Sequence, residues 1–164
     1  MNSRRHHLFT LGGLLGALAG IPGMARATAA HVAHVYDVVL SEAEWKNRLS
    51  PQQYEVLRRS GTERPYTSPL NREKRAGIFH CAGCDRPLFS SAAKFESGTG
   101  WPSFWQPLAA TAVHEESDTS FGVRRTGVLC QGCGGHLGHV FDDGPKPTGL
   151  RYCMNGVAMK FQPA

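Results

Sequence analysis

The sequence predicts a mainly β domain with short helices on its N-terminal side. Three observations support this fold class. Two helix-start patterns follow each other between residues 41 and 61, and short apolar or aromatic stretches broken by Gly, Pro, Asp and Ser begin near residue 78. The length of 164 residues suits a single domain with its own core.

Residues 1–27 are expected to form a signal peptide. Arg4 and Arg5 precede a short apolar, glycine-rich run over residues 8–21, and the small residues of Ala25-Arg26-Ala27 offer a cleavage site. The run has roughly half of the ~20 residues that span a bilayer, so we expect cleavage rather than a stable membrane anchor. The adjacent arginines favour the twin-arginine export route, and an ordinary Sec signal is the alternative. The mature protein is therefore expected to be periplasmic.

Much of the positive charge belongs to this first segment. The chain carries a formal net charge of +5, and three of its 18 basic residues lie in the first 27 residues, which contain no Asp or Glu. The remainder holds 15 basic and 13 acidic residues and is nearly neutral. It gives no electrostatic reason to expect a nucleic-acid partner.

The next segment leads into the two expected helices. Residues 28–40 contain no helix cap, and we expect a flexible or extended segment. Ser41 followed by Glu44 matches a capping box, which predicts the start of the first helix. Ser50-Pro51-Gln52-Gln53 repeats the pattern with Pro at the first helical position, and Gly61 is expected to end the second helix.

The domain proper is expected to span residues 41–164, with its strands after the helices. Ile78–His80, Gly122–Arg124 and Val157–Met159 are examples of the short apolar stretches that we expect to be strands. The turn-forming residues between such stretches predict an antiparallel arrangement with tight connections.

Four of the five cysteines form two pairs with the spacing of metal ligands. Cys81-Ala82-Gly83-Cys84 and Cys130-Gln131-Gly132-Cys133 each separate two thiols by two residues, and the glycine before the second cysteine is expected to let the backbone turn. Two such knuckles complete a tetrahedral four-sulfur site, which predicts a structural zinc. Disulfides are the alternative, because an oxidising compartment permits them. The predicted zinc ligands are Cys81, Cys84, Cys130 and Cys133.

Cys153 is the one cysteine outside these pairs. Arg151 precedes it by two residues, and a guanidinium beside a thiol favours the thiolate, which is the nucleophilic form. The sequence therefore predicts one reactive thiol.

Histidines and carboxylates gather shortly before this cysteine. The segment contains His136 and His139 and ends in two carboxylates, the second of which is Asp143. Residues three apart in a strand face opposite sides, so Gly138 is expected to bend the chain if both imidazoles serve one pocket. Two structural histidines are the plainer alternative, but the crowding with Cys153 favours proton transfer near neutral pH.

Aromatic residues surround a glycine-proline turn. Phe104 and Trp105 are expected to pack in the core. Trp101, which follows Gly100, is the better candidate for a pocket wall against an apolar group.

Together these segments resemble the B-type methionine sulfoxide reductases, also called methionine-R-sulfoxide reductases. The resemblance rests on Arg86–Ser91, Lys94–Phe104, His136–Gly144 and Gly149–Asn155, and it runs in order from about residue 41 to residue 161. It implies a β-tent fold of two antiparallel sheets with short N-terminal helices. It also implies reduction of the R epimer of methionine sulfoxide, free or in proteins.

The resemblance implies roles for individual residues as well. It assigns zinc to the four paired cysteines and the nucleophile to Cys153. The residues that it places around the substrate are Trp101, His136, His139, Asp143, Arg151 and Asn155. In the expected mechanism Cys153 attacks the sulfoxide sulfur and becomes a sulfenic acid. The proton for the oxygen is expected from His139 or from a water held by His136 and Asp143.

One departure from the family pattern bears on the reductant. Many family members carry a second cysteine between the glycines before the tryptophan, where this chain has Thr99. An external thiol, such as a thioredoxin-like protein, is therefore expected to regenerate Cys153. The expected role is repair of oxidised exported proteins by a monomeric enzyme.

Two other classes are alternatives at this point. A zinc-ribbon interaction module would explain the paired cysteines, but it leaves the His136 to Asp143 segment and Cys153 without a role. A thiol-disulfide oxidoreductase would use one pair as its redox centre, but it would need a βαβ unit around that pair, which the sequence does not indicate.

Overall fold

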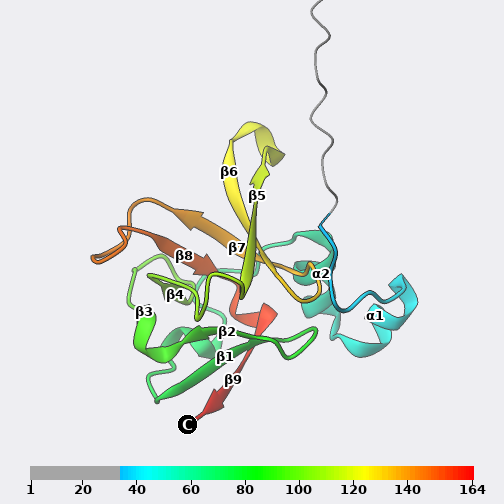
Figure 1. The fold of residues 1–164 in the computed structure, drawn as a ribbon, viewed down its shortest axis with the longest axis horizontal. Helices are drawn as coiled ribbons and strands as arrows, with labels where there is room; N and C mark the ends of the chain where they lie inside the picture. Colours follow the sequence, from blue (N-terminus) through cyan, green and yellow to red (C-terminus); the bar gives the residue numbers. More distant parts are fainter. Residues whose placement is uncertain (1–33) are drawn as a thin grey trace, which may run out of the picture. The chain divides into compact units, whose positions relative to one another are not determined.

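Two antiparallel sheets and two N-terminal helices make up the part of the chain that the structure describes, which is residues 34–164 of a computed structural model (Figure 1). The expected signal peptide and residues 28–33 lie outside the described residues. Among the described helices, none has the length and apolar character needed to cross a bilayer.

Helices α1 (Glu42–Arg48) and α2 (Pro51–Arg59) begin where the capping patterns predict. The Ser41 hydroxyl accepts a hydrogen bond from the Glu44 N–H at 3.3 Å, and the Glu44 carboxylate accepts one from the Ser41 N–H at 2.8 Å. The second box, at Ser50, forms in the same way. Each box satisfies two N–H groups that have no partner inside the helix, which confirms the predicted starts.

The end of α2 differs in detail from the prediction. Ser60, not Gly61, adopts the left-handed conformation, with φ 55°. The Gly61 N–H donates to the Glu55 carbonyl at 3.0 Å, and a Cβ at Gly61 would lie only 3.0 Å from that oxygen. Glycine is therefore needed here for close backbone approach rather than for an unusual φ.

Residues 34–40 form neither a helix nor a strand, and the chain bends at Asp37. The Val38 N–H donates to the Gly132 carbonyl at 2.8 Å, and Asp37 pairs with Arg86 at 2.9 Å. Both partners belong to or adjoin the cysteine knuckles, so this segment connects the two knuckles on the surface.

The strands form a three-stranded and a six-stranded sheet, and every pairing is antiparallel. The smaller sheet has the order β2 (Pro87–Ser90), β1 (Gly77–Cys81), β9 (Met159–Pro163). The larger has the order β3 (Lys94–Phe95), β4 (Ser103–Phe104), β8 (Arg151–Met154), β7 (His136–Phe141), β6 (Arg125–Cys130), β5 (Val113–Asp118). Short 3₁₀ turns are η1 (Pro69–Arg72), η2 (Ser91–Ala93), η3 (Ser120–Gly122) and η4 (Gly156–Ala158).

Three phenylalanines join the two sheets in the core. Phe79 on β1 and Phe89 on β2 both contact Phe104 on β4, with ring centroids 4.9 Å and 4.4 Å apart, and all three are fully buried. Burial of one such side chain contributes about 1.5–3 kcal/mol to stability. The core position predicted for Phe104 is confirmed, whereas Trp105 is only half-buried.

Two of the three stretches expected to be strands need correction. Ile78–His80 lies in β1, as predicted. Gly122 instead ends η3 with φ +71°, which an extended strand does not allow, and β6 begins only at Arg125. Residues 157–158 lie in η4, and β9 begins at Met159. The N–H groups of Gly156 and Val157 donate to a side-chain carboxylate rather than to a neighbouring strand.

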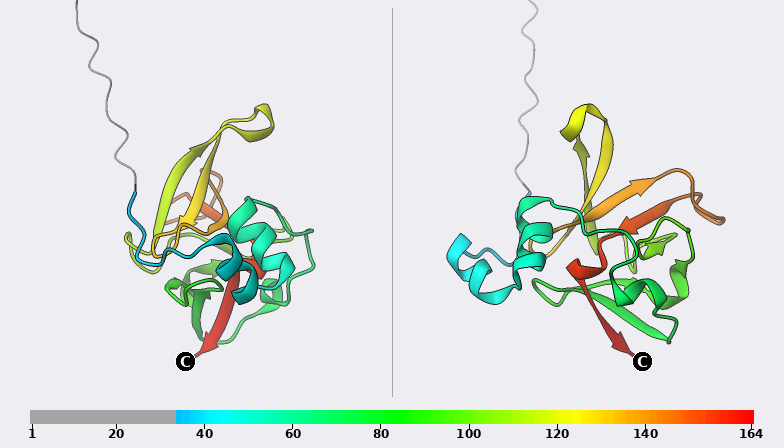
Figure 2. Two further views of the ribbon diagram at one scale, coloured as in Figure 1. Left: turned by 90° about the vertical axis from the view of Figure 1, so that its right-hand side faces the viewer. Right: turned by 180° about the vertical axis from the view of Figure 1, so that it is seen from behind.

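The β5–β6 hairpin extends away from the rest of the described chain (Figure 2). Strand β6 then pairs with β7, and β7 with β8, so β7 lies between the hairpin and the strand that carries Cys153.

Candidate active site

The four paired cysteines form one cluster where β1 and β6 end. Their sulfur atoms all lie within 4.8 Å of one another. The Sγ atoms of Cys81 and Cys133 are 3.8 Å apart, and those of Cys84 and Cys130 are 3.5 Å apart. A tetrahedral site with zinc–sulfur bonds of about 2.3 Å places its sulfur atoms about 3.8 Å apart. The cluster is thus positioned to bind a metal ion, and none of the five cysteines forms a disulfide.

The turns of the two knuckles span residues 82–84 and 131–133, which include the predicted glycines, and a left-handed residue follows each turn. Asp85 and Gly134 have the left-handed φ values, 60° and 68°, whereas Gly83 and Gly132 do not. A Cβ at Gly132 would lie 3.3 Å from the sulfur of Cys84. Gly132 therefore makes room for the facing knuckle, at Cys84 and Arg86, whereas a Cβ at Gly83 would meet its neighbours at ordinary contact distances.

The cluster connects the two sheets. Cys81 is the last residue of β1 in the small sheet, and Cys130 is the last residue of β6 in the large one. Arg58 of α2 donates to the Cys133 carbonyl at 3.0 Å and stacks over the Trp45 ring at 4.9 Å, which holds both helices against this end. Four thiolate ligands leave no open coordination position, so a metal here would be structural.

Cys153 lies half-buried on β8. Its direct partners across the sheet are His139 on β7 and Ser103 on β4. Directly paired residues project from the same face, with Cβ atoms about 4.5–5.5 Å apart. The sheet therefore brings a thiol and an imidazole together from strands that are separated by a long connection.

A bulge in β7 brings the two predicted histidines together. Residues 136 and 138 pair with adjacent residues of β6, so Leu137 is an extra residue. The ring centroids of His136 and His139 lie 5.2 Å apart. The irregularity predicted at Gly138 thus occurs beside it. Gly138 itself permits close strand approach, because a Cβ there would lie 2.1 Å from the Cys153 carbonyl oxygen.

The two histidines have different surroundings. His136 is 7% exposed, and its Nε2 is buried without a hydrogen-bond partner among the described residues. Burial, helped by the nearby His139, lowers the pKa of His136 to about 4. His136 is therefore neutral at physiological pH and is not a cationic acid there.

A carboxylate that the sequence analysis did not single out holds His139. Asp118, the last residue of β5, lies 2.7 Å from the His139 Nε2 and 2.9 Å from the Arg125 guanidinium. Hydrogen bonds from Ser120 and His139, with the charge of Arg125, hold the pKa of Asp118 well below its usual range. The carboxylate fixes the orientation of the imidazole ring. Asp118 and His139 are 21 residues apart in sequence, and the pairing of β5 with β6 and of β6 with β7 brings them together.

Asp143, which was expected to hold a water together with His136, pairs with Arg151. Its carboxylate accepts two hydrogen bonds from the guanidinium, both at 2.8 Å. The guanidinium also lies 4.4 Å from the centre of the Phe141 ring. The hydrogen bonds to Asp143 and the charge of Cys153 raise the pKa of Arg151. Arg151 and Cys153 project from the same face of β8, so Asp143 holds the guanidinium on the face of the sheet that carries the thiol.

Trp101 and Asn155 are both tied to the segment between α2 and η1. The Trp101 indole donates to the Glu63 carbonyl at 3.1 Å, and the Asn155 side-chain oxygen accepts from the Glu63 N–H at 2.9 Å. The Asn155 amide nitrogen donates to the Leu137 carbonyl at 3.0 Å. The Asn155 amide thus links β7 to this segment, and the half-buried Trp101 ring is held in place by its N–H.

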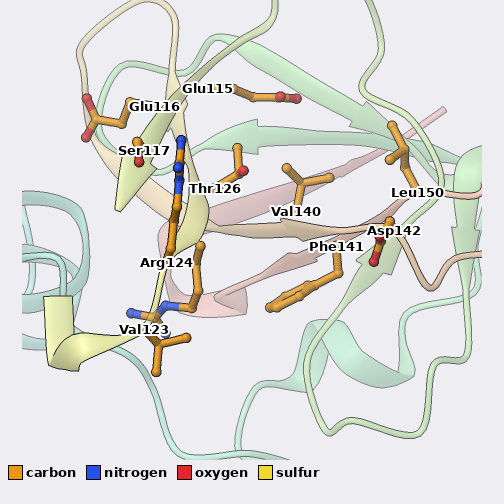
Figure 3. A pocket seen from close by; sticks show the side chains of 11 residues that line it. Glu115, Glu116, Ser117, Val123, Arg124, Thr126, Val140, Phe141, Asp142 and Leu150 are labelled. Atoms are coloured by element: carbon orange, nitrogen blue, oxygen red, sulfur yellow. The ribbon is translucent and has the colours of Figure 1, made fainter. Parts of the chain in front are cut away.

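A hollow of about 900 Å³ lies beside the β5–β6 hairpin, on the face of the large sheet opposite to the one that carries Cys153 (Figure 3). Ser117, Thr126 and Val140 form a row of cross-strand partners in its lining. These residues alternate with His139 and its partners, so the row faces away from Cys153. This hollow is separate from the thiol.

The fold and these groups define a protein of two antiparallel sheets with one half-buried free thiol and a separate cysteine cluster positioned to bind a metal ion. A half-buried free cysteine has an arginine on its own strand and an imidazole–carboxylate pair on the next, apart from the four-cysteine cluster. Each CxxC pair lies at the turn after an antiparallel strand, so neither has the βαβ setting of a thiol-disulfide oxidoreductase.

Comparison with known proteins gives the family. The SelR domain model matches residues 49–163. The peptide methionine sulfoxide reductase MsrB of Agrobacterium fabrum is 53% identical over 123 residues, which cover 75% of this chain and 91% of that protein. Proteins of the same name from Pseudomonas putida (strain W619) and Leptospira interrogans are 58% and 52% identical, over 73% and 77% of this chain and 90% and 97% of their own lengths. The chain belongs to the SelR-domain family of MsrB-type peptide methionine sulfoxide reductases.

Proposed function

We propose that the chain reduces methionine R-sulfoxide, free or in proteins, to methionine, with Cys153 as the nucleophile. The relatives carry the name peptide methionine sulfoxide reductase, and the family match covers most of the chain. The observation that carries the proposal is the cross-strand pairing of Cys153 with His139, because it sets the one thiol outside the metal cluster beside a proton donor.

In the first step the Cys153 thiolate attacks the sulfoxide sulfur. The positive charge of Arg151 favours the thiolate, and Asp143 holds that guanidinium in place. His139 gives a proton to the sulfoxide oxygen, and Asp118 stabilises the imidazolium that supplies it. The oxygen ends on Cys153 as a sulfenic acid and methionine leaves. The cysteine sulfur loses two electrons and the substrate sulfur gains two.

Three further residues are proposed to shape the substrate pocket. Trp101 would contact the substrate methyl group and so help to select the epimer, which its fixed indole supports. His136 would contribute a neutral ring nitrogen rather than a proton. Asn155 would position these groups through its two backbone partners.

An outside thiol is proposed to regenerate the enzyme. All other cysteines belong to the metal cluster, so the sulfenic acid has no internal thiol to react with. A thioredoxin-like protein or a small thiol would form a mixed disulfide with Cys153 and release water, and a second thiol would then free Cys153. We expect the enzyme to act as a monomer.

The metal is proposed to be zinc, bound by Cys81, Cys84, Cys130 and Cys133. Zinc would supply no step of the reaction and would hold the small sheet to the large one. The sulfur separations and the all-cysteine ligand set support this assignment.

Residues 1–27 are proposed to export the protein to the periplasm, with the repair of oxidised exported proteins as its role. The paired arginines and the short apolar run support this proposal. Cell fractionation tests it: the mature chain should appear in the periplasm, and replacing Arg4 and Arg5 by lysine should retain it inside the cell if the twin-arginine route is used. Cytoplasmic wild-type protein would refute export.

The reaction is tested with separated R and S epimers of a methionine sulfoxide. Wild-type protein should consume the R epimer only, and Cys153→Ser should consume neither while keeping its bound metal and its fold. Turnover of the R epimer by Cys153→Ser would refute the nucleophile. Mass spectrometry after one turnover without reductant should detect a Cys153 sulfenic acid, and an internal disulfide would refute the single-thiol scheme.

A further inference from the structure

Three hydroxyl groups form a chain that leads from the Cys153 sulfur into the protein. The Thr99 Oγ1 lies 3.7 Å from the Cys153 Sγ, within hydrogen-bond distance for sulfur. The Ser97 hydroxyl lies 2.8 Å from that of Thr99 and 2.7 Å from that of Ser103. The Ser103 hydroxyl in turn donates to the Trp101 carbonyl at 3.1 Å.

The backbone holds these three hydroxyl groups in place. Gly98 and Gly100 have φ values of +74° and +94°, and they fold the loop so that Ser97 and Thr99 approach each other. Tyr66 fixes the loop from outside, because its N–H donates to the Gly100 carbonyl at 2.7 Å and its hydroxyl donates to the Gly98 carbonyl at 2.6 Å. At the other end Ser103 is fully buried and paired with Cys153 across the sheet.

The hydrogen bonds along these three hydroxyls can run in either of two directions, because each hydroxyl can donate only one proton. With Ser103 donating to the Trp101 carbonyl, Ser97 donates to Ser103 and Thr99 donates to Ser97. Thr99 then accepts a hydrogen bond from the thiol of Cys153. In the reverse order Ser103 donates to Ser97, Ser97 to Thr99, and Thr99 to the sulfur. Only the reverse order suits a thiolate, which accepts hydrogen bonds and donates none.

We propose that Thr99, supported by Ser97 and Ser103, donates a hydrogen bond to the charged sulfur of Cys153 and thereby increases the fraction of thiolate. Ionisation of the thiol would reverse the direction of these hydrogen bonds by rotation of three hydroxyls, without moving a heavy atom. The position that holds a second cysteine in many family members would thus hold a hydroxyl that stabilises the attacking sulfur. The proposal rests on the proposed function only in taking Cys153 as the reacting thiol.

Charged and titratable groups also face this sulfur from the strands of the large sheet. His139 is its partner on β7 and is paired with Asp118, and Arg151 lies on β8 and is paired with Asp143. These groups are unchanged by substitutions at Thr99, so a comparison of variants isolates the contribution of the hydroxyl.

The test measures the rate of Cys153 alkylation by iodoacetamide against pH, on the metal-bound protein, with the modified peptide followed by mass spectrometry. Thr99→Val removes the hydroxyl at nearly constant volume and should move the midpoint of the curve to higher pH. Below the midpoint its rate should fall about three- to tenfold, because the net contribution of an intramolecular hydrogen bond corresponds to a factor of about this size. The rates of both proteins should converge at high pH, where every thiol is ionised.

Thr99→Ser keeps the hydroxyl and should restore the wild-type curve, and Ser97→Ala should shift the curve in the same direction as Thr99→Val but less. An unchanged midpoint in Thr99→Val, or an equal shift in Thr99→Ser, would overturn the proposal. If Thr99→Val fails to fold, Ser97→Ala decides by the same criterion. Alkylation requires no sulfoxide turnover, so this result is independent of whether the chain proves to be a reductase.

Discussion

Replacement of Asp118 by Asn is a sharp test of how the sheet organises the site. In the wild type the Asp118 carboxylate lies 2.7 Å from the His139 Nε2, and His139 is the direct partner of Cys153. Asn keeps the shape and one acceptor oxygen but removes the charge. It should therefore weaken the interaction that holds His139, which the proposed reaction uses to protonate the sulfoxide oxygen.

The expected size follows from the contact. A hydrogen bond to a charged group contributes about 1.5–3 kcal/mol. The side chains of His139 and Asp118 are 13% and 23% exposed, so solvent screens part of the interaction. The Asn oxygen also retains a neutral hydrogen bond, and both effects favour the lower limit. A loss of about 1.5 kcal/mol in transition-state stabilisation lowers kcat/KM about tenfold.

The assay compares kcat/KM for the R epimer between wild type, Asp118→Asn and Asp142→Asn. Asp142 is exposed and contacts neither histidine, so its substitution removes the same charge and should leave kcat/KM within about twofold of wild type. Equal values for Asp118→Asn and Asp142→Asn would show that the Asp118 carboxylate does not act through His139. Cys153 alkylation of both variants at one pH checks that the thiol itself is intact.

Three further predictions concern stability. The folded pKa of His136, about 4, lies below its unfolded value of 6.5, so the unfolded chain binds the proton first and stability should fall as pH drops from 6.5 towards 4. The loss of stability should reach about 3 kcal/mol. Urea unfolding at several pH values should show a smaller pH dependence in His136→Gln and the wild-type dependence in the control His114→Gln. Equal pH profiles of the two variants would contradict the role of His136. Cys130→Ser should reduce bound metal from about one ion per chain to near zero and lower Tm, and full metal content by elemental analysis would argue against a four-cysteine site. Gly138→Ala would place a Cβ 2.1 Å from the Cys153 carbonyl, whereas the nearest atom to a Cβ at Gly127 is 3.7 Å away. In urea unfolding the first change should destabilise the fold by about 2–3 kcal/mol, or it should prevent folding. The second should be neutral or should stabilise the fold by up to about 1 kcal/mol, because Gly loses more backbone entropy on folding than Ala. Equal effects would contradict the packing argument.

Local features of the fold were predictable because they depend on near neighbours in sequence. The capping boxes at Ser41 and Ser50 involve residues three apart, and both helices begin where those boxes predict. The strand at residues 78–80 was also recognised. The 3₁₀ turn η4 was not, because its N–H groups bond to the carboxylate of Glu63, which lies more than 90 residues earlier.

The candidate site was predictable in its residue types but not in its pairings. Cys153, Arg151 and His139 were marked by chemistry that is close together in sequence. The carboxylates were harder: the sequence does not indicate that Asp143 pairs with Arg151, and it does not single out Asp118. A carboxylate shows its partner only when the strands are in register, because its charge alone does not select one cation or imidazole among many.

The sequence by itself determined that five cysteines divide into four with metal-ligand spacing and one without, and it indicated the family through contiguous motifs. Tertiary structure alone decided which groups meet. The bulge at Leu137 brings together two imidazoles that a regular strand would separate, and the antiparallel pairing of β7 with β8 sets His139 opposite Cys153. Ligand spacing within a knuckle depends on four consecutive residues, whereas register depends on the packing of both sheets.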